Sequence, residues 1–387
     1  MTASRWFHDI YGPGLAYSGY APPGADRWLP RDRAFLFALT GNQLVVAGDM
    51  PIVCAAGAAT EAGLDLLRAN GFRLPSRLLA FRDEQDYGRR LAELAGSGIR
   101  MVVQHRHPDA VLPEAHCWLA PETLSRLNDK GRLADLVPAG AAPRRTVFAA
   151  AALPDDLPTP CVLKVATPDS TGGGALDIHL CRGPQDVAVA AAKLAGCERL
   201  VAEEWLPAAR FLCLNYAIDP HGEIAYLGGT EIINGPAGTY LGNWLGAAVS
   251  LPAAAVAAGH AVAERGAAAG YRGCLCIDAA ELPDGRVLIF DLNFRACGST
   301  VPLLVIEALA ARHGATLAKF RSWSWTGGYA ELLRAARRLE GELVPLVSFD
   351  PAVHGEVGPA RVNGLLLGTS REEIARREAD MAQSGWI

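Results

Sequence analysis

The chain has 387 residues, of which half are hydrophobic and 20% are charged, and its formal net charge is −5 at pH 7. This length predicts two or three domains with sizeable cores, and the composition excludes a long disordered chain. The acidic balance, and the lack of a Lys/Arg cluster with interleaved aromatic residues, argue against a general nucleic-acid binder.

The N-terminal third predicts an open α/β sheet preceded by an irregular arm. Residues 1–32 are rich in Gly, Pro and Tyr and show little periodicity. From 42 to 125, strand-like and helix-like apolar runs alternate, which favours a mainly parallel sheet with helices on its faces. No glycines follow a strand in GxGxxG order, so a dinucleotide site, and with it an α/β dehydrogenase, is disfavoured. The expected strands are 43–49, 77–81 and 100–105, and the expected helices are 58–70 and 83–97.

The rest of the chain predicts further strands and helices. A helix over 121–136 precedes a link at 138–143 that contains Pro and Gly. Residues 211–219 and 223–233 predict two paired strands around an Asp-Pro-His-Gly turn. The Ala-rich segment 252–269 is interrupted by charged residues, so it predicts a soluble helix rather than a membrane span. Other strands are expected at 160–166, 176–181, 199–206, 342–348 and 361–368, and other helices at 184–195, 328–340 and 369–383.

A β-hairpin is the strongest local signal in the sequence. Two apolar, β-prone runs, 274–282 and 287–294, flank the turn-forming sequence Pro-Asp-Gly. A four-residue loop over 283–286 would place Leu282 opposite Val287. The positions of the acidic side chains follow from this register.

In that register, Asp278 faces Asp291 across the two strands. The period-two rule then places Asn293 and Arg295 on the same face as Asp291. Two carboxylates directly opposite each other repel, so a chain that pairs them predicts a cation between them. Hard oxygen ligands suit Mg²⁺, which in such sites usually also binds phosphate. The alternative is a solvated hairpin face whose charges keep the sheet edge soluble.

Lys164 predicts a second binding element. It lies inside the apolar strand VLKVA, four residues before the loop 168–175, which contains the sequence STGGG. Glycine adopts positive φ without strain, so such a loop can point backbone N–H groups at an anion, and a nearby lysine supplies a point charge. The alternatives are a gatekeeper lysine on an exposed strand edge and an ordinary hairpin turn. The loop residues are Ser170, Thr171, Gly172, Gly173 and Gly174.

A connector and two histidines complete the candidates. The segment AEEWLP places Glu203 and Glu204 at the end of an apolar strand, where a backbone connector would offer an acceptor to the exocyclic amine of adenine. The alternative is ordinary surface charge. His105 and His107 follow a predicted strand, and we expect both to cap a loop rather than to contact substrate.

Taken in order, these motifs resemble the ATP-grasp fold over residues 120–310. The order is a first lysine in a helix, a second in a strand, a glycine-rich loop, an acidic connector and a metal hairpin. The resemblance implies an α/β fold with an α+β core, an N-terminal open parallel-sheet (pre-ATP-grasp) domain and a small C-terminal extension. The implied ATP-binding residues are Lys130, Lys164, the five STGGG-loop residues, Glu203, Glu204, Trp205 and Leu206.

The resemblance also implies the reacting centre. Asp278, Asp291 and Asn293 would carry Mg²⁺, with Mn²⁺ as a substitute, while Arg295 and Lys164 would be the catalytic residues. Arg295 would steady the acylphosphate. Asp291 replaces the glutamate that is more common in the family. The glutamate that often binds ribose is matched by Arg210, so ribose binding must come from elsewhere or from Glu204.

The implied division of the chain has four parts. They are an N-terminal α/β domain at 1–120, an ATP-grasp lid at 121–198, a central nucleotide and metal subdomain at 199–320, and a C-terminal extension at 321–387. The layout is similar to the amide-forming ligases of natural-product pathways, of the pheganomycin peptide ligase type. That likeness rests on LNDKGRLADLVP, GGTEIINGPAGTYLGNW and GTSREEIARRE.

The implied activity is ATP-dependent joining of a carboxylate to an amine through an acylphosphate, with ADP and phosphate released. The alternatives are an ATP-grasp enzyme with a non-amine acceptor (thioester or carboxyphosphate chemistry) and a non-catalytic nucleotide-binding regulator. The expected partners are a small-molecule carboxylate and an amine, as amino acids or peptides, and a second copy in a homodimer. Neither nucleic acid nor membrane is expected.

Cysteine usage points to a compartment. The nine cysteines are scattered, mostly inside apolar runs, and lack the spacing of a zinc site. We therefore expect small buried residues in a reducing cytoplasm. The N-terminal sequence MTASRWFHDIYGPG lacks the apolar core of a signal peptide, which agrees with a cytoplasmic location.

Overall fold

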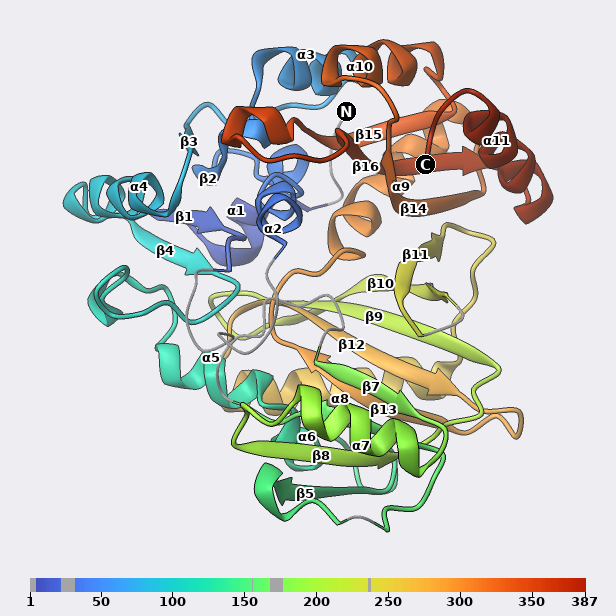
Figure 1. Ribbon diagram of the computed structural model, residues 1–387. Helices are drawn as coiled ribbons and strands as arrows, with labels where there is room; N and C mark the ends of the chain where they lie inside the picture. The colour runs from blue at the N-terminus through green and yellow to red at the C-terminus, as the bar shows by residue number, and fades with distance from the viewer. Residues whose placement is uncertain (1–4, 22–31, 155, 168–176, 236–237) are drawn as a thin grey trace.

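The computed structural model describes residues 5–21, 32–154, 156–167, 177–235 and 238–387. Within them the chain forms three sheets with helices packed on their faces (Figure 1). The N-terminal α/β layers lie beside the C-terminal strands, and Figure 1 shows α3 (Glu61–Ala69) next to α10 (Tyr329–Arg338). No helix in the described ranges is long and apolar enough to cross a membrane.

The N-terminal sheet has four parallel strands in the order β3-β2-β1-β4. The expected parallel sheet is therefore confirmed, but its first strand is not at 43–49. That segment contains a short 3-10 helix, η1 (Leu44–Val46), and the strand is residues 15–18 of the expected irregular arm. The strands are β1 (Leu15–Ser18), β2 (Ile52–Ala55), β3 (Leu78–Phe81) and β4 (Arg100–Val103), and the other helices are α1 (Phe7–Tyr11), α2 (Arg33–Leu39) and α4 (Glu84–Gly96).

The early strand escaped prediction for a physical reason. β1 pairs on both sides, with β2 and with β4, so all four of its residues are buried and no exposed position alternates with them. A central parallel strand reads as a short apolar run rather than as an alternation. The equally apolar Leu44, Val45 and Val46 are buried as well, so hydrophobicity does not distinguish the two segments.

The second sheet is antiparallel and has the order β5-β8-β6-β7. One helix, α7 (Pro184–Lys193), packs against it. The boundary expected at 198 does not coincide with a sheet boundary, because β8 pairs with β5 and β6 rather than with the strands that follow it. The strands are β5 (Arg145–Ala149), β6 (Cys161–Val165), β7 (Ile178–Cys181) and β8 (Arg199–Glu204).

The third sheet has eight strands in the order β13-β12-β9-β10-β11-β14-β16-β15. The C-terminal strands extend the central ones, and the boundary expected at 320 falls inside β14. The strands are β9 (Arg210–Ile218), β10 (Ile224–Asn234), β11 (Tyr240–Leu245), β12 (Gly273–Glu281), β13 (Val287–Asn293), β14 (Leu317–Ser324), β15 (Leu343–Phe349) and β16 (Arg361–Gly368). The helices are α8 (Ala253–Ala268), α9 (Thr300–His313), α10 and α11 (Arg371–Gln383).

The sequence signals for this sheet differ in strength. The paired strands around 219–222 and the helix start at Ser370 are confirmed, since Ser370 Oγ accepts from Glu373 N. Helix α9 was not anticipated. It is buried through most of its first two turns, so it lacks the polar face that an amphipathic pattern needs.

The helix expected over 121–136 is broken at Asp129. The chain instead forms α5 (Pro121–Asn128), a 3-10 turn η4 (Lys130–Arg132) and a short α6 (Leu133–Leu136). Asp129 has extended backbone angles (φ −71°, ψ 109°), and its Oδ1 accepts from Gly131 N at 2.9 Å. A local side-chain bond of this kind competes with continued helix. Lys130 therefore begins a new turn instead of continuing the surface of α5.

His107 has the loop-capping role expected of it. It is 3% exposed, its Nδ1–H donates to His105 O at 2.8 Å, and its Nε2 accepts from the Tyr87 hydroxyl at 2.6 Å. One nitrogen donates and the other accepts, which is the pattern of the neutral ring. Burial lowers the pKa of His107 to about 4. The cysteine prediction is also confirmed, because all nine are free thiols and seven are buried.

The depressed pKa of His107 predicts acid sensitivity. The unfolded chain protonates this ring below about pH 6.5, whereas the folded chain resists protonation down to about 4, so stability falls as pH drops through that window. At pH 5, protonation of this histidine in the unfolded chain lowers the unfolding free energy by about 2 kcal/mol. We expect His107→Gln to reduce the difference in unfolding free energy between pH 7 and pH 5, measured by urea titration. An unchanged difference would contradict the neutral, buried assignment.

Candidate nucleotide and metal site

The hairpin pairs the two acidic residues as expected, but by a different register. Glu281, not Leu282, lies opposite Val287, and the ladder shifts by one residue between Asp278 and Ala279. The extra residue is Phe290, which makes a β-bulge. The predicted four-residue loop was thus wrong by one position, and the bulge restores the pairing of Asp278 with Asp291.

The two facing carboxylates have opposite electrostatic surroundings. Burial, and then repulsion from Asp291, raise the pKa of Asp278 to about 7. Burial would also raise the pKa of Asp291, but the ammonium groups of Lys130 and Lys164 lower it below its ordinary value. The exposed-face alternative is wrong for this hairpin, because Asp291 is 9% and Asn293 6% exposed.

Lys130 neutralises one of these carboxylates directly. Its Nζ donates to Asp291 Oδ1 at 3.0 Å, and the helix break at Asp129 places Lys130 at the start of a new turn. Burial alone would lower the pKa of Lys130, but Asp291 raises it above its ordinary value. Lys130 and the acidic hairpin, 161 residues apart in sequence, are therefore in contact.

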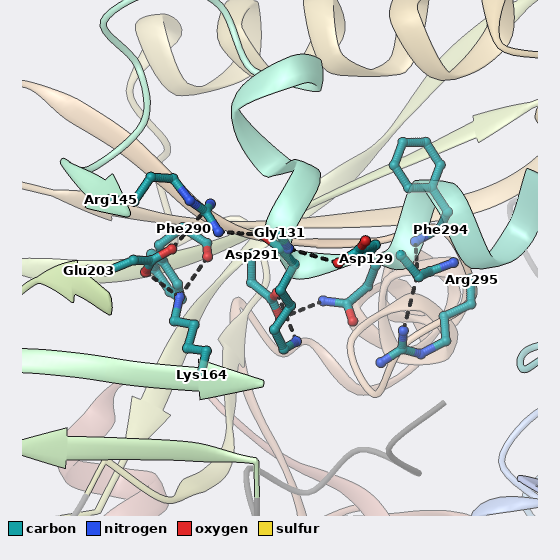
Figure 2. Close-up of polar contacts among 12 residues, drawn as sticks. Asp129, Gly131, Arg145, Lys164, Glu203, Phe290, Asp291, Phe294 and Arg295 are labelled. Atoms are coloured by element: carbon teal, nitrogen blue, oxygen red, sulfur yellow. Dashed lines mark hydrogen bonds and ion pairs between the residues drawn. The ribbon is translucent and has the colours of Figure 1, made fainter. Parts of the chain in front are cut away.

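Lys164 is buried in a central strand, so the gatekeeper alternative is wrong. Its side chain is 4% exposed and lies 2.5 Å from Glu203 Oε2. Its Nζ also donates to the carbonyl of the bulged residue Phe290 at 2.8 Å (Figure 2). A bulge leaves its extra residue outside the ladder, which frees this carbonyl for the lysine. Lys164 thereby links the second sheet to the third.

The two glutamates of the connector lie in different environments, one buried and one at the surface. Glu203 is 3% exposed and lies between Lys164 and Arg145, whose Nη1 is 3.2 Å from Glu203 Oε1. Arg145 Nη2 also donates to Lys130 O. Glu204 instead pairs at the surface with Arg144, at 2.7 Å. Trp205 and Leu206 follow β8 in a loop.

Arg295 follows the end of β13 and is held by a side chain that the sequence interpretation missed. Asn128 Oδ1 accepts from Arg295 Nη1 at 3.3 Å and from Phe294 N at 2.9 Å (Figure 2). Asn293 Nδ2 donates to Asp291 Oδ2 at 3.3 Å, which leaves its carbonyl oxygen as the end that could coordinate an ion. The signal for Asn128 was its place two residues before Lys130, at the end of α5.

Arg210 occupies the position at which the resemblance implies a ribose-binding glutamate. Its guanidinium pairs with Glu281 at 2.5 Å, and a guanidinium has no acceptor for a ribose hydroxyl. The predicted loop residues, Ser170, Thr171, Gly172, Gly173 and Gly174, lie outside the described residues.

The donor set fits a hard cation that shares its coordination with phosphate. Within the described ranges, no three His, Cys, Asp or Glu side chains gather as metal ligands. The hairpin offers two carboxylates and one amide oxygen. Mg²⁺ is commonly held by one or two carboxylates, while water and phosphate oxygens fill the other positions. Asp278, Asp291 and Asn293 could hold such an ion.

Comparisons with known proteins agree on an ATP-grasp architecture. Residues 6–125 match the family model of the L-aspartate–L-methionine ligase N-terminal domain, and residues 143–293 match that of the L-aspartate–L-methionine ligase ATP-grasp domain. An L-amino acid ligase from Bacillus licheniformis superposes with a TM-score of 0.54 at 14% identity, over 86% of this chain and 96% of that one.

Two other solved structures share the fold at similar distance. Biotin carboxylase from Campylobacter jejuni gives a TM-score of 0.58 at 11% identity, over 88% of this chain and 87% of that chain. N5-carboxyaminoimidazole synthase from Aspergillus clavatus, solved with ADP, gives 0.56 at 12% identity, over 96% and 99%. At these identities the likeness shows the fold, and the expected ATP-grasp architecture is confirmed.

The buried pairing of Glu203 predicts a large loss of stability in Glu203→Gln. Lys164 and Arg145, at 4% and 7% exposure, would both lose their charged partner. Removing one member of a buried ion pair costs about 3–5 kcal/mol. The matched control is Glu204→Gln, whose partner Arg144 is 88% exposed, and we expect a loss below about 1 kcal/mol. Equal unfolding free energies for the two variants would contradict the burial argument.

Proposed function

Since this chain is an ATP-grasp carbon–nitrogen ligase, we propose that it activates the carboxylate of one amino acid and joins it to the amino group of a second. The names of the matched family models support L-aspartate and L-methionine as the first pair to try. The observation that carries the proposal is the convergence of two lysines, an arginine and two facing carboxylates at one bulged hairpin.

The proposed division of labour follows from the contacts. Lys130 and Lys164 bind the phosphates of ATP. Without nucleotide, Lys130 pairs with Asp291 and Lys164 pairs with Glu203, so that a carboxylate balances each ammonium charge. Arg295 holds the acyl group, oriented by Asn128. Asp278, Asp291 and Asn293 would hold Mg²⁺, or Mn²⁺ in its place, which when bound supplies positive charge next to the phosphates.

In the proposed reaction an oxygen of the acid's carboxylate attacks the γ-phosphorus of ATP, and ADP leaves. The amine nitrogen then attacks the acyl carbon of the acylphosphate, phosphate leaves with its bonding electrons, and the nitrogen loses a proton. The protein contributes alignment and neutralisation of charge rather than covalent catalysis. No cysteine or serine nucleophile is required.

The finer expectations belong to the same proposal. We infer a role in natural-product biosynthesis of the pheganomycin type, a cytoplasmic location and a homodimer, and the nine free thiols support a reducing compartment. Acceptors other than amines, which would give thioester or carboxyphosphate chemistry, are the second candidates, because structures of the same fold include a biotin carboxylase. The four-domain division and the site residues are part of this proposal too.

The experiment that tests the function is a two-substrate screen. Purified protein is supplied with ATP, Mg²⁺ and pairs of amino acids, starting with L-aspartate and L-methionine, and phosphate release and product mass are recorded. We expect stoichiometric ADP, phosphate and dipeptide only when both an acid and an amine are present. Phosphate release that needs the acid but no amine would instead favour a different acceptor, and no release with any pair would reject the proposal.

Arg295 is expected to act after nucleotide binding. Its planar fork suits two oxygens of the acyl group at once, a geometry that lysine cannot reproduce. Arg295→Lys should therefore keep ATP affinity near the parental value while slowing ligation at least about tenfold, or about 1.4 kcal/mol of transition-state stabilisation. The control is Arg286→Lys, which lies on the exposed turn of the same hairpin and pairs with Asp284. A parental ligation rate in Arg295→Lys would remove Arg295 from the site.

A further inference from the structure

The N-terminal sheet reverses its strand order next to the candidate site. From β1 the chain moves to β2 and β3 on one side, then returns to place β4 on the other side of β1. In open parallel sheets, ligands bind outside the carboxyl ends of the strands at such a point. Ser18 and Val103 are paired at the ends of β1 and β4, so Gly19 and Gln104 are the first residues beyond the sheet.

Three oxygen atoms surround Gly19 where a side chain would otherwise stand. A Cβ at this residue would lie 3.2 Å from Gln43 Oε1, 3.6 Å from Gln104 Oε1 and 3.7 Å from Leu39 O, and these are its three nearest atoms. We name this group of three oxygens the Gly19 cradle. It contains acceptors only, and none of them is charged.

The orientation of the Gln104 amide is fixed by its other contacts. Its Nε2 donates to Tyr17 Oη at 2.6 Å and to Ala296 O at 2.7 Å. Turning the amide over would set its oxygen against the carbonyl oxygen of Ala296, so the oxygen must face Gly19. Ala296 directly follows Arg295, and Gln104 therefore ties the cradle to the candidate acyl site.

Gln43 provides the unsatisfied acceptor. Its side chain is 3% exposed, and its Oε1 is buried and accepts no hydrogen bond from any residue that the structure describes. Leaving a buried acceptor without a donor costs about 1–3 kcal/mol. Such an atom next to a topological switch point indicates a ligand that brings N–H groups.

We propose that the Gly19 cradle binds the α-ammonium group of the amino acid whose carboxylate is activated. An ammonium group has three N–H donors, which match the three acceptors. The attacking amine needs a free lone pair, so a set that engages three hydrogens suits the amino group that does not react. This inference rests on the proposed function, and it makes the acid substrate an α-amino acid with a free amino group.

The test compares amino acids with their desamino analogues by calorimetric titration of the full chain in the presence of ADP and Mg²⁺. The pairs are L-aspartate against succinate, and L-methionine against its own desamino analogue. We expect the parental chain to bind one amino acid at least tenfold more tightly than its analogue. Gly19→Ala, which fills the space, and Gln43→Leu, which removes an oxygen, should bring that ratio close to one.

Two further variants control for folding. Gly88→Ala, in α4 with open space at the Cβ position, should keep the parental ratio. Gln43→Glu keeps an acceptor oxygen and should also bind the amino acid more tightly than its desamino analogue. If Gly19→Ala fails to fold, the comparison of Gln43→Leu with Gln43→Glu still tests the proposal. An unchanged ratio in Gln43→Leu, or a parental chain without preference in either pair, would overturn the cradle. A failed ligation screen rejects the proposed function instead, because this titration requires no turnover.

Discussion

The structure of the site follows from one unfavourable contact, the pairing of Asp278 with Asp291 on adjacent strands. Two carboxylates in that position are tolerated inside a protein when positive charge lies close by or when one of them is protonated. Lys130 supplies it from outside the sheet, and the break in the helix at Asp129 is what allows Lys130 to reach the hairpin. The local helix break at Asp129 and the long-range pairing of Lys130 with Asp291 thus both serve to place a positive charge beside the two carboxylates.

A second buried charge, Lys164, couples two sheets that have no strands in common. Its pairing with Glu203 lies within the second sheet, whereas its bond to Phe290 O reaches the third. Because Lys164 and Glu203 are both almost fully enclosed, the contact between the sheets is made by a buried lysine whose charge is balanced within its own sheet, and not by apolar side chains alone. This contact holds Lys164, which we propose binds a phosphate of ATP, against the hairpin.

The sequence predicted those parts of the molecule that local patterns determine. The hairpin and the parallel sheet follow from turn formers and strand periodicity, and the residues of the candidate site were selected from the order of the motifs. Features that depend on contacts across the chain were missed. No residue type near Phe290 predicts a bulge, and hydrophobicity does not distinguish β1 from η1. The role of Asn128 could be predicted only by knowing that α5 ends beside Arg295.

The bulge at Phe290 also has an evolutionary consequence. If the same residues formed a ladder without the bulge, Asp278 would lie opposite Phe290, and Asp291 would fall on the other face of its strand. Deleting Phe290 would instead give a regular ladder that still pairs the two aspartates, but it would remove the carbonyl that Lys164 binds. We therefore expect related chains that lack the extra residue to keep the facing aspartates but to offer Lys164 a different acceptor.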